Sequence, residues 1–237
     1  MSLIDTPKEI RVGEEIDSNT LDSYLKKQFP DLQGEIIIKQ FPDGASNLTY
    51  LISYENRELI LRRPPFGRIA KSAHNMVREA KVMQALKPVY SDIPTIFVLH
   101  EDSEQPHQQI MDCDFYLMER VVGIIPRKNL PKGLTLSKKQ TQKLCTNVID
   151  KLIALHQVDY KKAGLSDLGK GAGYVERQIV SWGKRYQQAM TEDAASFSEV
   201  IAWLNDNMPD DVATCIIHND FRFDNVVLNN KNPLEVI

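Results

Sequence analysis

The sequence predicts an α+β fold in two lobes, a small antiparallel-sheet lobe followed by a mostly helical lobe. Between residues 35 and 121, short runs rich in Ile, Leu, Val, Phe and Tyr are separated by turn residues, with one helical pattern among them. Residues 122–136 contain two prolines and two glycines and interrupt this pattern. After residue 137 the apolar residues recur mostly at helical spacing. Strands that precede helices, rather than alternate with them, are typical of α+β proteins. We therefore expect an N-terminal lobe over residues 1–120 and a helical lobe over residues 121–237.

The elements of the first lobe follow from local patterns. Apolar residues at helical spacing predict a helix over 18–29. Apolar runs bounded by turn residues predict three strands, and Pro64 and Pro65 end the third. A helix is expected from the N-cap Ser72 to about Lys87, where Pro88 stops it. Two further strands complete this lobe, so that the expected strands are 35–41, 48–54, 58–63, 95–100 and 115–121.

The second lobe is predicted to be helical. Ser137 is the expected N-cap of a long helix that ends near His156, with four leucine or valine residues at helical spacing. Further helices are expected over 173–190 and 197–207.

Charge, apolar runs and cysteines exclude several classes of protein. The net charge of −3 and the pI of about 6.0 argue against a nucleic-acid partner. No apolar run reaches the roughly 18 residues that a membrane helix needs, so no membrane partner is expected. The first twenty residues lack the pattern of a secretory signal. Cys113, Cys145 and Cys215 are widely spaced and form no C-x-x-C pair, which favours reduced thiols and a cytoplasmic location.

A cluster of polar residues interrupts the apolar stretch IIHNDFRFDNVVL, residues 216–228. His218, Asp220 and Asn225 have the spacing of a kinase catalytic loop, in which an Asp orients the attacking hydroxyl and an Asn five residues later binds magnesium. Buried polar groups need partners, so the same residues are also compatible with a polar turn in which Asp220 and Asn225 cap backbone groups. The spacing alone leaves both interpretations open.

A turn-forming loop, PDGASN over residues 42–47, joins the first two predicted strands. Gly44 allows backbone conformations that other residues avoid, and backbone N–H groups and the Ser46 hydroxyl suit phosphate oxygens. The loop is not a complete G-x-G-x-x-G motif, and Asp-Gly is also a common hairpin turn. A phosphate-covering loop and a plain hairpin therefore both fit.

The predicted helix over 72–87 carries a carboxylate on its apolar stripe, because Glu79 shares one face with two methionines and a leucine. Arg62 and Arg63 lie on the third predicted strand, and one of them must face inward because side chains alternate along a strand. A strand cation paired with a helix carboxylate is the arrangement with which kinases hold nucleotide phosphates. The alternative is that Glu79 lies at the solvated edge of the stripe.

Five segments in this order resemble one family: FPDGASNLTYLI, LILRRPP, SAHNMVREAKVMQAL, FYLMERVVG and HNDFRFDN. They resemble the aminoglycoside phosphotransferase and choline kinase family, which has a protein-kinase-like fold. Within it they are most similar to the kinase-like domains fused to acyl-CoA dehydrogenases and to their free-standing bacterial relatives. The resemblance extends from about Gln40 to the last residue.

The resemblance implies roles for the residues of HNDFRFDN. Asp220 is the implied catalytic base, and Asn225 is an implied magnesium ligand. Arg222 would neutralise the transferring phosphoryl group. His218 is expected to support the loop through hydrogen bonds.

The resemblance also implies an ATP site in the first lobe. Arg62 would take the place of the phosphate-anchoring lysine, paired with Glu79, and Gly44 and Ser46 would lie over the phosphates. LMERV would form the hinge between the lobes. There the carbonyl of Glu119 and the N–H of Val121 would bind adenine. The implied cofactors are therefore ATP and Mg²⁺.

The sequence departs from the family pattern at three places. The anchor is Arg rather than Lys, and the planar, permanently charged guanidinium is not equivalent to an ammonium. Residue 219 is Asn, as in choline kinases, where many antibiotic kinases have Gly. The family places a second metal-binding Asp directly after a strand such as LEVI, with which this chain ends. The resemblance thus implies a kinase-like fold that is incomplete at its C-terminus, and a chain that is inactive by itself.

The expected activity is the ATP- and magnesium-dependent phosphorylation of a hydroxyl group on a small molecule. The alternative is a catalytically impaired kinase-like module that binds nucleotide or an acyl-thioester partner. A third class is a structural or interaction domain that binds no nucleotide. Neither the substrate nor the oligomeric state is defined by the sequence.

Overall fold

The computed structural model describes residues 3–42, 47–66, 75–102, 110–127 and 129–237. It forms two compact units, of which the first joins residues 1–158 to 217–237 and the second contains residues 159–216. The first unit includes the long helix α3 (Lys138–His156), whose Lys151 pairs with Asp92 at 2.8 Å. The lobe boundary predicted at residues 120–121 is a different division of the chain and stays a prediction.

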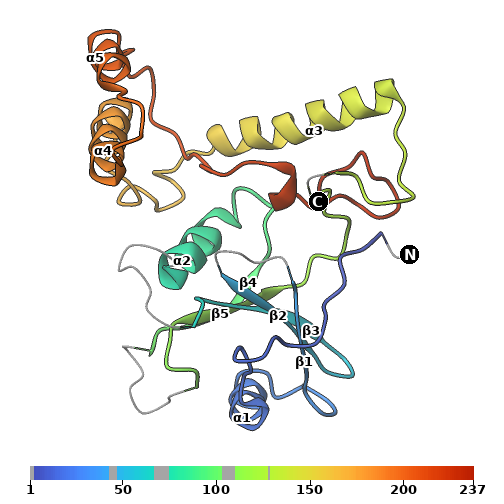
Figure 1. Ribbon diagram of the computed structural model, residues 1–237. Coiled ribbons are helices and arrows are strands. Elements are labelled where there is room, and N and C mark those ends of the chain that lie inside the picture. The colour runs from blue at the N-terminus through green and yellow to red at the C-terminus, as the bar shows by residue number, and fades with distance from the viewer. Residues whose placement is uncertain (1–2, 43–46, 67–74, 103–109, 128) are drawn as a thin grey trace. The chain divides into compact units, whose positions relative to one another are not determined.

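A five-stranded antiparallel sheet forms the centre of the first unit (Figure 1). Its strand order is β1-β2-β3-β5-β4, so the hairpin predicted from residues 35–54 is present. The first predicted strand is shorter than expected because its pairing with β2 begins only at Ile37, opposite Ser53. The strands are β1 (Ile37–Gln40), β2 (Leu48–Ser53), β3 (Glu58–Arg63), β4 (Ile96–His100) and β5 (Phe115–Glu119).

Helices α1 (Ser18–Gln28) and α2 (Met76–Leu86) lie on opposite faces of this sheet (Figure 1). Because side chains alternate along each strand, Leu61 and Phe115 pack toward α1, in the larger core. Tyr116 packs on the other face with Met76 and Ala80 of α2. The alternation therefore decides which side chains of β3 and β5 can reach α2.

The start of α2 differs from the sequence prediction. The predicted cap, Ser72, lies outside the described residues. The helix begins at Met76, and the side chain of Asn75 accepts a hydrogen bond of 2.7 Å from the Arg78 N–H. Asn75 therefore satisfies a backbone donor of the first turn, which is the role of an N-cap.

The linker after β5 is tied to the segment that follows the polar motif. Ile124 and Leu228 exchange two backbone hydrogen bonds of 2.8 Å, and both side chains are fully buried. A Cβ at Gly123 would overlap the carbonyl oxygen of Leu228, so only glycine permits this close approach. The same core includes Leu144 and Val148 of α3, which starts with the predicted Ser137 cap in a complete capping box.

The second unit contains the helices α4 (Tyr174–Ala189) and α5 (Ser198–Asp206), which pack against each other. Gly183 of α4 lies against Ile201 of α5. None of the residues of α5 is buried. Over the part of the chain that the structure describes, no helix is long and apolar enough to cross a membrane.

Candidate functional site

Arg62 and Glu79 form an ion pair between the sheet and α2. Arg62 lies opposite Thr49 of β2 and Tyr116 of β5, so its side chain shares their face of the sheet. Its Nη1 atom is 2.8 Å from Oε1 of Glu79, and both side chains are about one third exposed. The pairing predicted from the sequence is therefore present. Arg63 is buried and donates from Nε to the carbonyl oxygen of Pro64.

Two further side chains donate to Glu79. The hydroxyl of Tyr116 donates to Oε1 at 2.6 Å, and the amide Nδ2 of Asn47 donates to Oε2 at 3.4 Å. Burial raises the pKa of the Tyr116 hydroxyl well above its ordinary value, so this group stays a proton donor. Sequence analysis missed both residues. Asn47 ends the quoted loop, but Tyr116 becomes a neighbour of Arg62 only through the pairing of β3 with β5.

The loop expected to cover phosphates is described only at its ends. Gly44 and Ser46 lie outside the described residues. Where the hairpin closes, the N–H of Phe41 donates to the carbonyl oxygen of Thr49 at 2.9 Å. Both interpretations of this loop, phosphate-covering loop and plain hairpin, therefore stay open.

The predicted hinge begins where β5 ends. The carboxylate of Glu119 accepts hydrogen bonds from the backbone N–H and the hydroxyl of Thr95, at 3.1 and 2.9 Å. These bonds, led by the one from the backbone N–H, lower the pKa of the Glu119 carboxyl. The side chain is thus engaged in holding β5 beside the start of β4. The backbone N–H of Glu119 is also used there, because it donates to the carbonyl oxygen of Thr95 at 2.8 Å.

The polar motif forms a tight loop that ends in a short 3₁₀ helix, Phe223–Asn225. Asn219 has a φ of 65°, in the left-handed region that Asn and Gly adopt more readily than other residues. This explains physically why Asn can stand where related kinases have Gly. His218 accepts a hydrogen bond of 3.3 Å from the N–H of Asp220, and its role as a support of the loop stays a prediction.

The loop brings Asp220 and Asn225 together. Nδ2 of Asn225 donates both to the carbonyl oxygen of Asp220, at 2.8 Å, and to its carboxylate, at 2.9 Å. Because the NH₂ group is used in this way, the amide oxygen is the atom that Asn225 can offer to a cation. The same two bonds would also hold a purely structural turn, so the geometry is compatible with both interpretations of the motif.

Among the described residues, Arg222 forms neither a hydrogen bond nor an ion pair with Asp220. Its guanidinium forms an ion pair with Asp224, and its side chain is 61% exposed. An exposed pair of this kind contributes little stability and exchanges partners readily. Arg222 can therefore leave Asp224 when a stronger anion is present.

The oxygen atoms of the loop suit magnesium, although they do not form a complete cage. Mg²⁺ prefers oxygen ligands and usually takes one or two from protein, with phosphates and waters completing its shell. Across the described ranges, no group of three or more His, Cys, Asp or Glu side chains is placed to hold a metal ion. The amide oxygen of Asn225 fits one place in the partial set of protein ligands that a nucleotide-bound magnesium requires.

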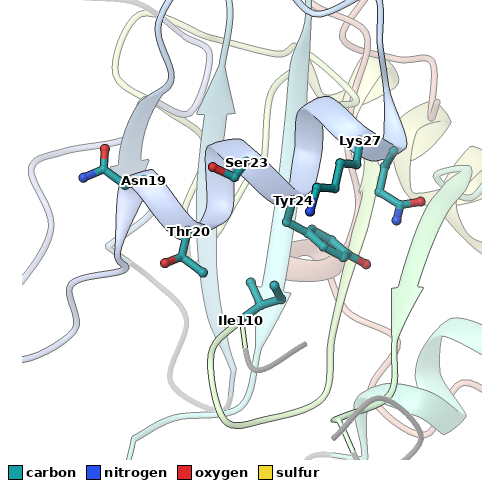
Figure 2. Close-up of a pocket in the computed structure, with 7 residues that line it drawn as sticks. Asn19, Thr20, Ser23, Tyr24, Lys27 and Ile110 are labelled. Atoms are coloured by element: carbon teal, nitrogen blue, oxygen red, sulfur yellow. The ribbon is translucent and has the colours of Figure 1, made fainter. Parts of the chain in front are cut away.

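A shallow pocket of about 530 Å³ lies elsewhere, along α1 (Figure 2). Its lining includes Thr20, Ser23, Tyr24 and Lys27 of the helix, together with Ile110. None of the residues predicted to act in catalysis or nucleotide binding lines it. The pocket is therefore separate from the candidate site.

Comparisons with known proteins place the chain among phosphotransferases. The sequence profile of the phosphotransferase enzyme family (APH) matches residues 37–237. Mouse acyl-CoA dehydrogenase family member 10 is 33% identical over 223 residues, which cover 94% of this chain but 20% of the relative. The human acyl-CoA dehydrogenase family member 11 is 31% identical over 228 residues, covering 94% of this chain and 28% of the relative. The chain thus spans between a fifth and a third of the length of these relatives.

A solved structure supports the same conclusion. A Ralstonia eutropha protein, provisionally described as an aminoglycoside phosphotransferase, is 27% identical with a TM-score of 0.77. The match covers 94% of this chain and 63% of that protein. The fold is the α+β fold of kinase-like phosphotransferases that the sequence predicted. Since the family profile covers most of the sequence and the fold agrees with it, the chain belongs to the phosphotransferase enzyme family.

Proposed function

We propose that the protein is an ATP- and magnesium-dependent kinase that transfers a phosphoryl group to a hydroxyl of a small molecule. The observation that carries the proposal is the ion pair of 2.8 Å between Arg62 on β3 and Glu79 on α2. Kinases use this combination of a strand cation and a helix carboxylate to hold nucleotide phosphates.

In this proposal the first unit binds the nucleotide. Arg62 contacts phosphate oxygens while Glu79 fixes the direction of its guanidinium, which presents several donors in one plane. Gly44 and Ser46 cover the phosphates, and the carbonyl of Glu119 and the N–H of Val121 bind adenine. A structural relative, a thermostable mutant of aminoglycoside phosphotransferase APH(4)-Ia, holds the ATP analogue AMP-PNP together with hygromycin B. It is 14% identical with a TM-score of 0.58, over 92% of this chain and 70% of its own, so it supports the fold alone.

The loop over residues 218–225 would carry the chemistry. Asp220 orients the acceptor hydroxyl and takes its proton, Arg222 leaves Asp224 to neutralise the transferring group, and His218 supports the loop. Asn225 would hold magnesium through its amide oxygen. When bound, magnesium would offset the negative charge of the phosphates. The protein mainly positions the reactants, because phosphoryl transfer requires little covalent catalysis.

We infer that the substrate is a hydroxylated metabolite, such as a hydroxyacyl compound, rather than an aminoglycoside. A polycationic aminoglycoside requires many carboxylates. Residues 164–183 provide only Asp167 and Glu176, and these are balanced by Lys170 and Arg177. The names of the curated relatives, acyl-CoA dehydrogenase family members, support an acyl compound.

A second candidate function is a catalytically impaired module that binds nucleotide or an acyl-thioester partner. The observation that favours it is the arginine at the anchor position, because the guanidinium differs from lysine in shape and in hydration. The first candidate requires both nucleotide binding and turnover. The second requires binding of a nucleotide or of an acyl-thioester partner, but no turnover.

The proposal is tested by measuring the Kd for ATP with magnesium in the full-length protein and in an Arg62→Ala variant. Loss of charge-assisted hydrogen bonds typically costs about 1.5–3 kcal/mol, so we expect the Kd to rise about 10- to 100-fold. The matched control is Arg57→Ala, because Arg57 is equally exposed (30% against 29%) and lies at the β2–β3 turn. Absence of ATP binding by the wild-type protein would refute the proposed function.

A further inference from the structure

We propose that Tyr116 is a positioning residue of the nucleotide site, because its hydroxyl holds the Glu79 carboxylate in place and, through it, Arg62. The inference rests on the proposed function and adds a residue that the sequence motifs do not contain. It concerns how the anchor is kept in one orientation in the absence of nucleotide.

Tyr116 is the most rigidly held member of the group around Glu79. Its side chain has no exposed surface and is packed against Met76, Ala80 and Ile96. The side chains of Arg62 and Glu79 are 29% and 31% exposed, and each rotates about several bonds. A buried ring has few alternative rotamers in a close-packed core. The Tyr116 hydroxyl therefore has a fixed position, and hydrogen bonding to it can restrict the rotamers of the Glu79 and Arg62 side chains.

The hydrogen bonds around Glu79 show how its carboxylate is held in one orientation. Tyr116 and Arg62 donate to the same oxygen, Oε1, at 2.6 and 2.8 Å. The bond from Asn47 to Oε2 is longer, at 3.4 Å, and weaker. Two short bonds at one oxygen fix both its position and the direction from which Arg62 approaches. Without the Tyr116 hydroxyl, the carboxylate can turn and Arg62 can follow it.

The protonation of Tyr116 suits this role. Burial, together with the neighbouring Glu79 carboxylate, raises its pKa, so the hydroxyl keeps its proton and donates over the whole physiological range. The hydroxyl therefore adds no negative charge of its own beside Glu79 and Arg62.

The chain contains a matched control on the other side of the sheet. Tyr54 is also buried, and its hydroxyl donates to Oδ1 of Asp22 at 2.7 Å. The Asp22 carboxylate pairs with a cation as well, since Lys26 is 2.9 Å from Oδ2. Tyr54→Phe thus removes the same kind of bond as Tyr116→Phe, but outside the candidate site.

The first test compares the two variants without nucleotide, by amide hydrogen exchange of the full-length protein. We expect Tyr116→Phe to increase exchange in α2, around Glu79, and Tyr54→Phe to leave α2 unchanged. Equal exchange of α2 in the wild type and in Tyr116→Phe would overturn the inference. This result does not depend on whether the protein binds ATP.

The second test measures the Kd for ATP with magnesium. We expect Tyr116→Phe to raise it about tenfold and Tyr54→Phe to change it less than about twofold. If Tyr116 acts through Glu79, Tyr116→Phe should have no further effect in a Glu79→Ala background, which removes the acceptor of the Tyr116 hydroxyl. Additive effects, or an unchanged Kd in Tyr116→Phe, would overturn the inference while leaving the proposed function intact. A wild-type protein that binds no ATP would refute the proposed function instead, and α2 exchange would still decide whether Tyr116 positions Glu79.

Discussion

The two compact units of the chain differ sharply in how much apolar surface they bury. The first unit has a continuous core between the sheet and α1, with Leu61 and Phe115 fully buried. In residues 159–216 only Leu165, Gly183 and Ile216 are buried. The two tryptophans of the protein, Trp182 on α4 and Trp203 on α5, are each 61% exposed.

This difference shows that a helix with an amphipathic sequence pattern does not necessarily bury its apolar side. The helices α3, α4 and α5 were all predicted from apolar residues at helical spacing, but only α3 places its stripe in a core. Arg62 and Glu79, which are proposed to bind nucleotide, lie in the unit with the core, where Tyr116 and Asn47 donate hydrogen bonds to Glu79.

The largest effect is expected when the same type of substitution, Leu to Ala, is made once in each unit. Leu61→Ala removes a side chain with no exposed surface and should lower the free energy of unfolding by about 2–5 kcal/mol. Leu204→Ala, on α5, truncates a side chain that is 38% exposed and should cost less than about 1 kcal/mol. Urea denaturation followed by circular dichroism measures both. Equal losses would show that the apolar side of α5 is covered in the folded protein.

Tryptophan fluorescence sharpens the comparison because both tryptophans belong to the second unit. We expect emission typical of solvent-exposed indole and ready quenching by iodide, with little change when the protein is unfolded in urea. Circular dichroism should change strongly over the same range, since the strands and most of the core lie in the first unit. Shielded, blue-shifted emission from the native protein would contradict the exposed placement of Trp182 and Trp203.

A smaller effect is expected from His100, in the core of the first unit. Its side chain has no exposed surface, it stacks on Phe115, and within the described residues neither ring nitrogen has a hydrogen-bond partner. Burial lowers the pKa of His100, and the carboxylates of Asp102 and Asp114 oppose this only partly. The unfolded chain therefore binds more protons than the folded one as the pH falls below the ordinary histidine pKa of about 6.5, and stability decreases.

Replacing His100 by Phe should reduce this loss of stability on acidification. The check is the difference in the free energy of unfolding between about pH 7.5 and pH 5.5, in the wild type and in the variant. An equal difference in both proteins would mean that another group causes the acid sensitivity.

The regular elements could be predicted because their signals are local. Strand and helix boundaries agree with the sequence predictions to within about two residues, except at the start of α2, which begins at Met76 rather than near Ser72. The fifth strand ends at Glu119 rather than Val121, because its pairing with β3 ends there, with Glu119 opposite Leu59. That pairing joins residues far apart in sequence and has no local signal.

The part of the candidate site that could be predicted is the part for which sequence periodicity determines the direction of the side chains. A period of 3.6 placed Glu79 on the apolar stripe of α2, and a period of two on β3 required one of Arg62 and Arg63 to face inward. The family resemblance then selected Arg62. Tyr116 could not be found in this way, because the neighbour of β3 in the sheet is β5 rather than β4. The pairing of Arg222 with Asp224 was missed because the 3₁₀ turn that brings them together is specified by the whole loop.

The central claim, that the loop over residues 218–225 is a phosphotransfer site, is tested most directly by Asp220→Asn. In the full-length protein, turnover of ATP with hydroxylated acceptors, including hydroxyacyl compounds, should fall about 10²- to 10⁴-fold, because Asp220 acts on proton transfer in the chemical step. The Kd for ATP with magnesium should stay within about twofold of the wild-type value, since Asp220 is not proposed to bind the nucleotide. Wild-type turnover in Asp220→Asn would contradict the account and would make Asp220 a residue that only shapes the turn.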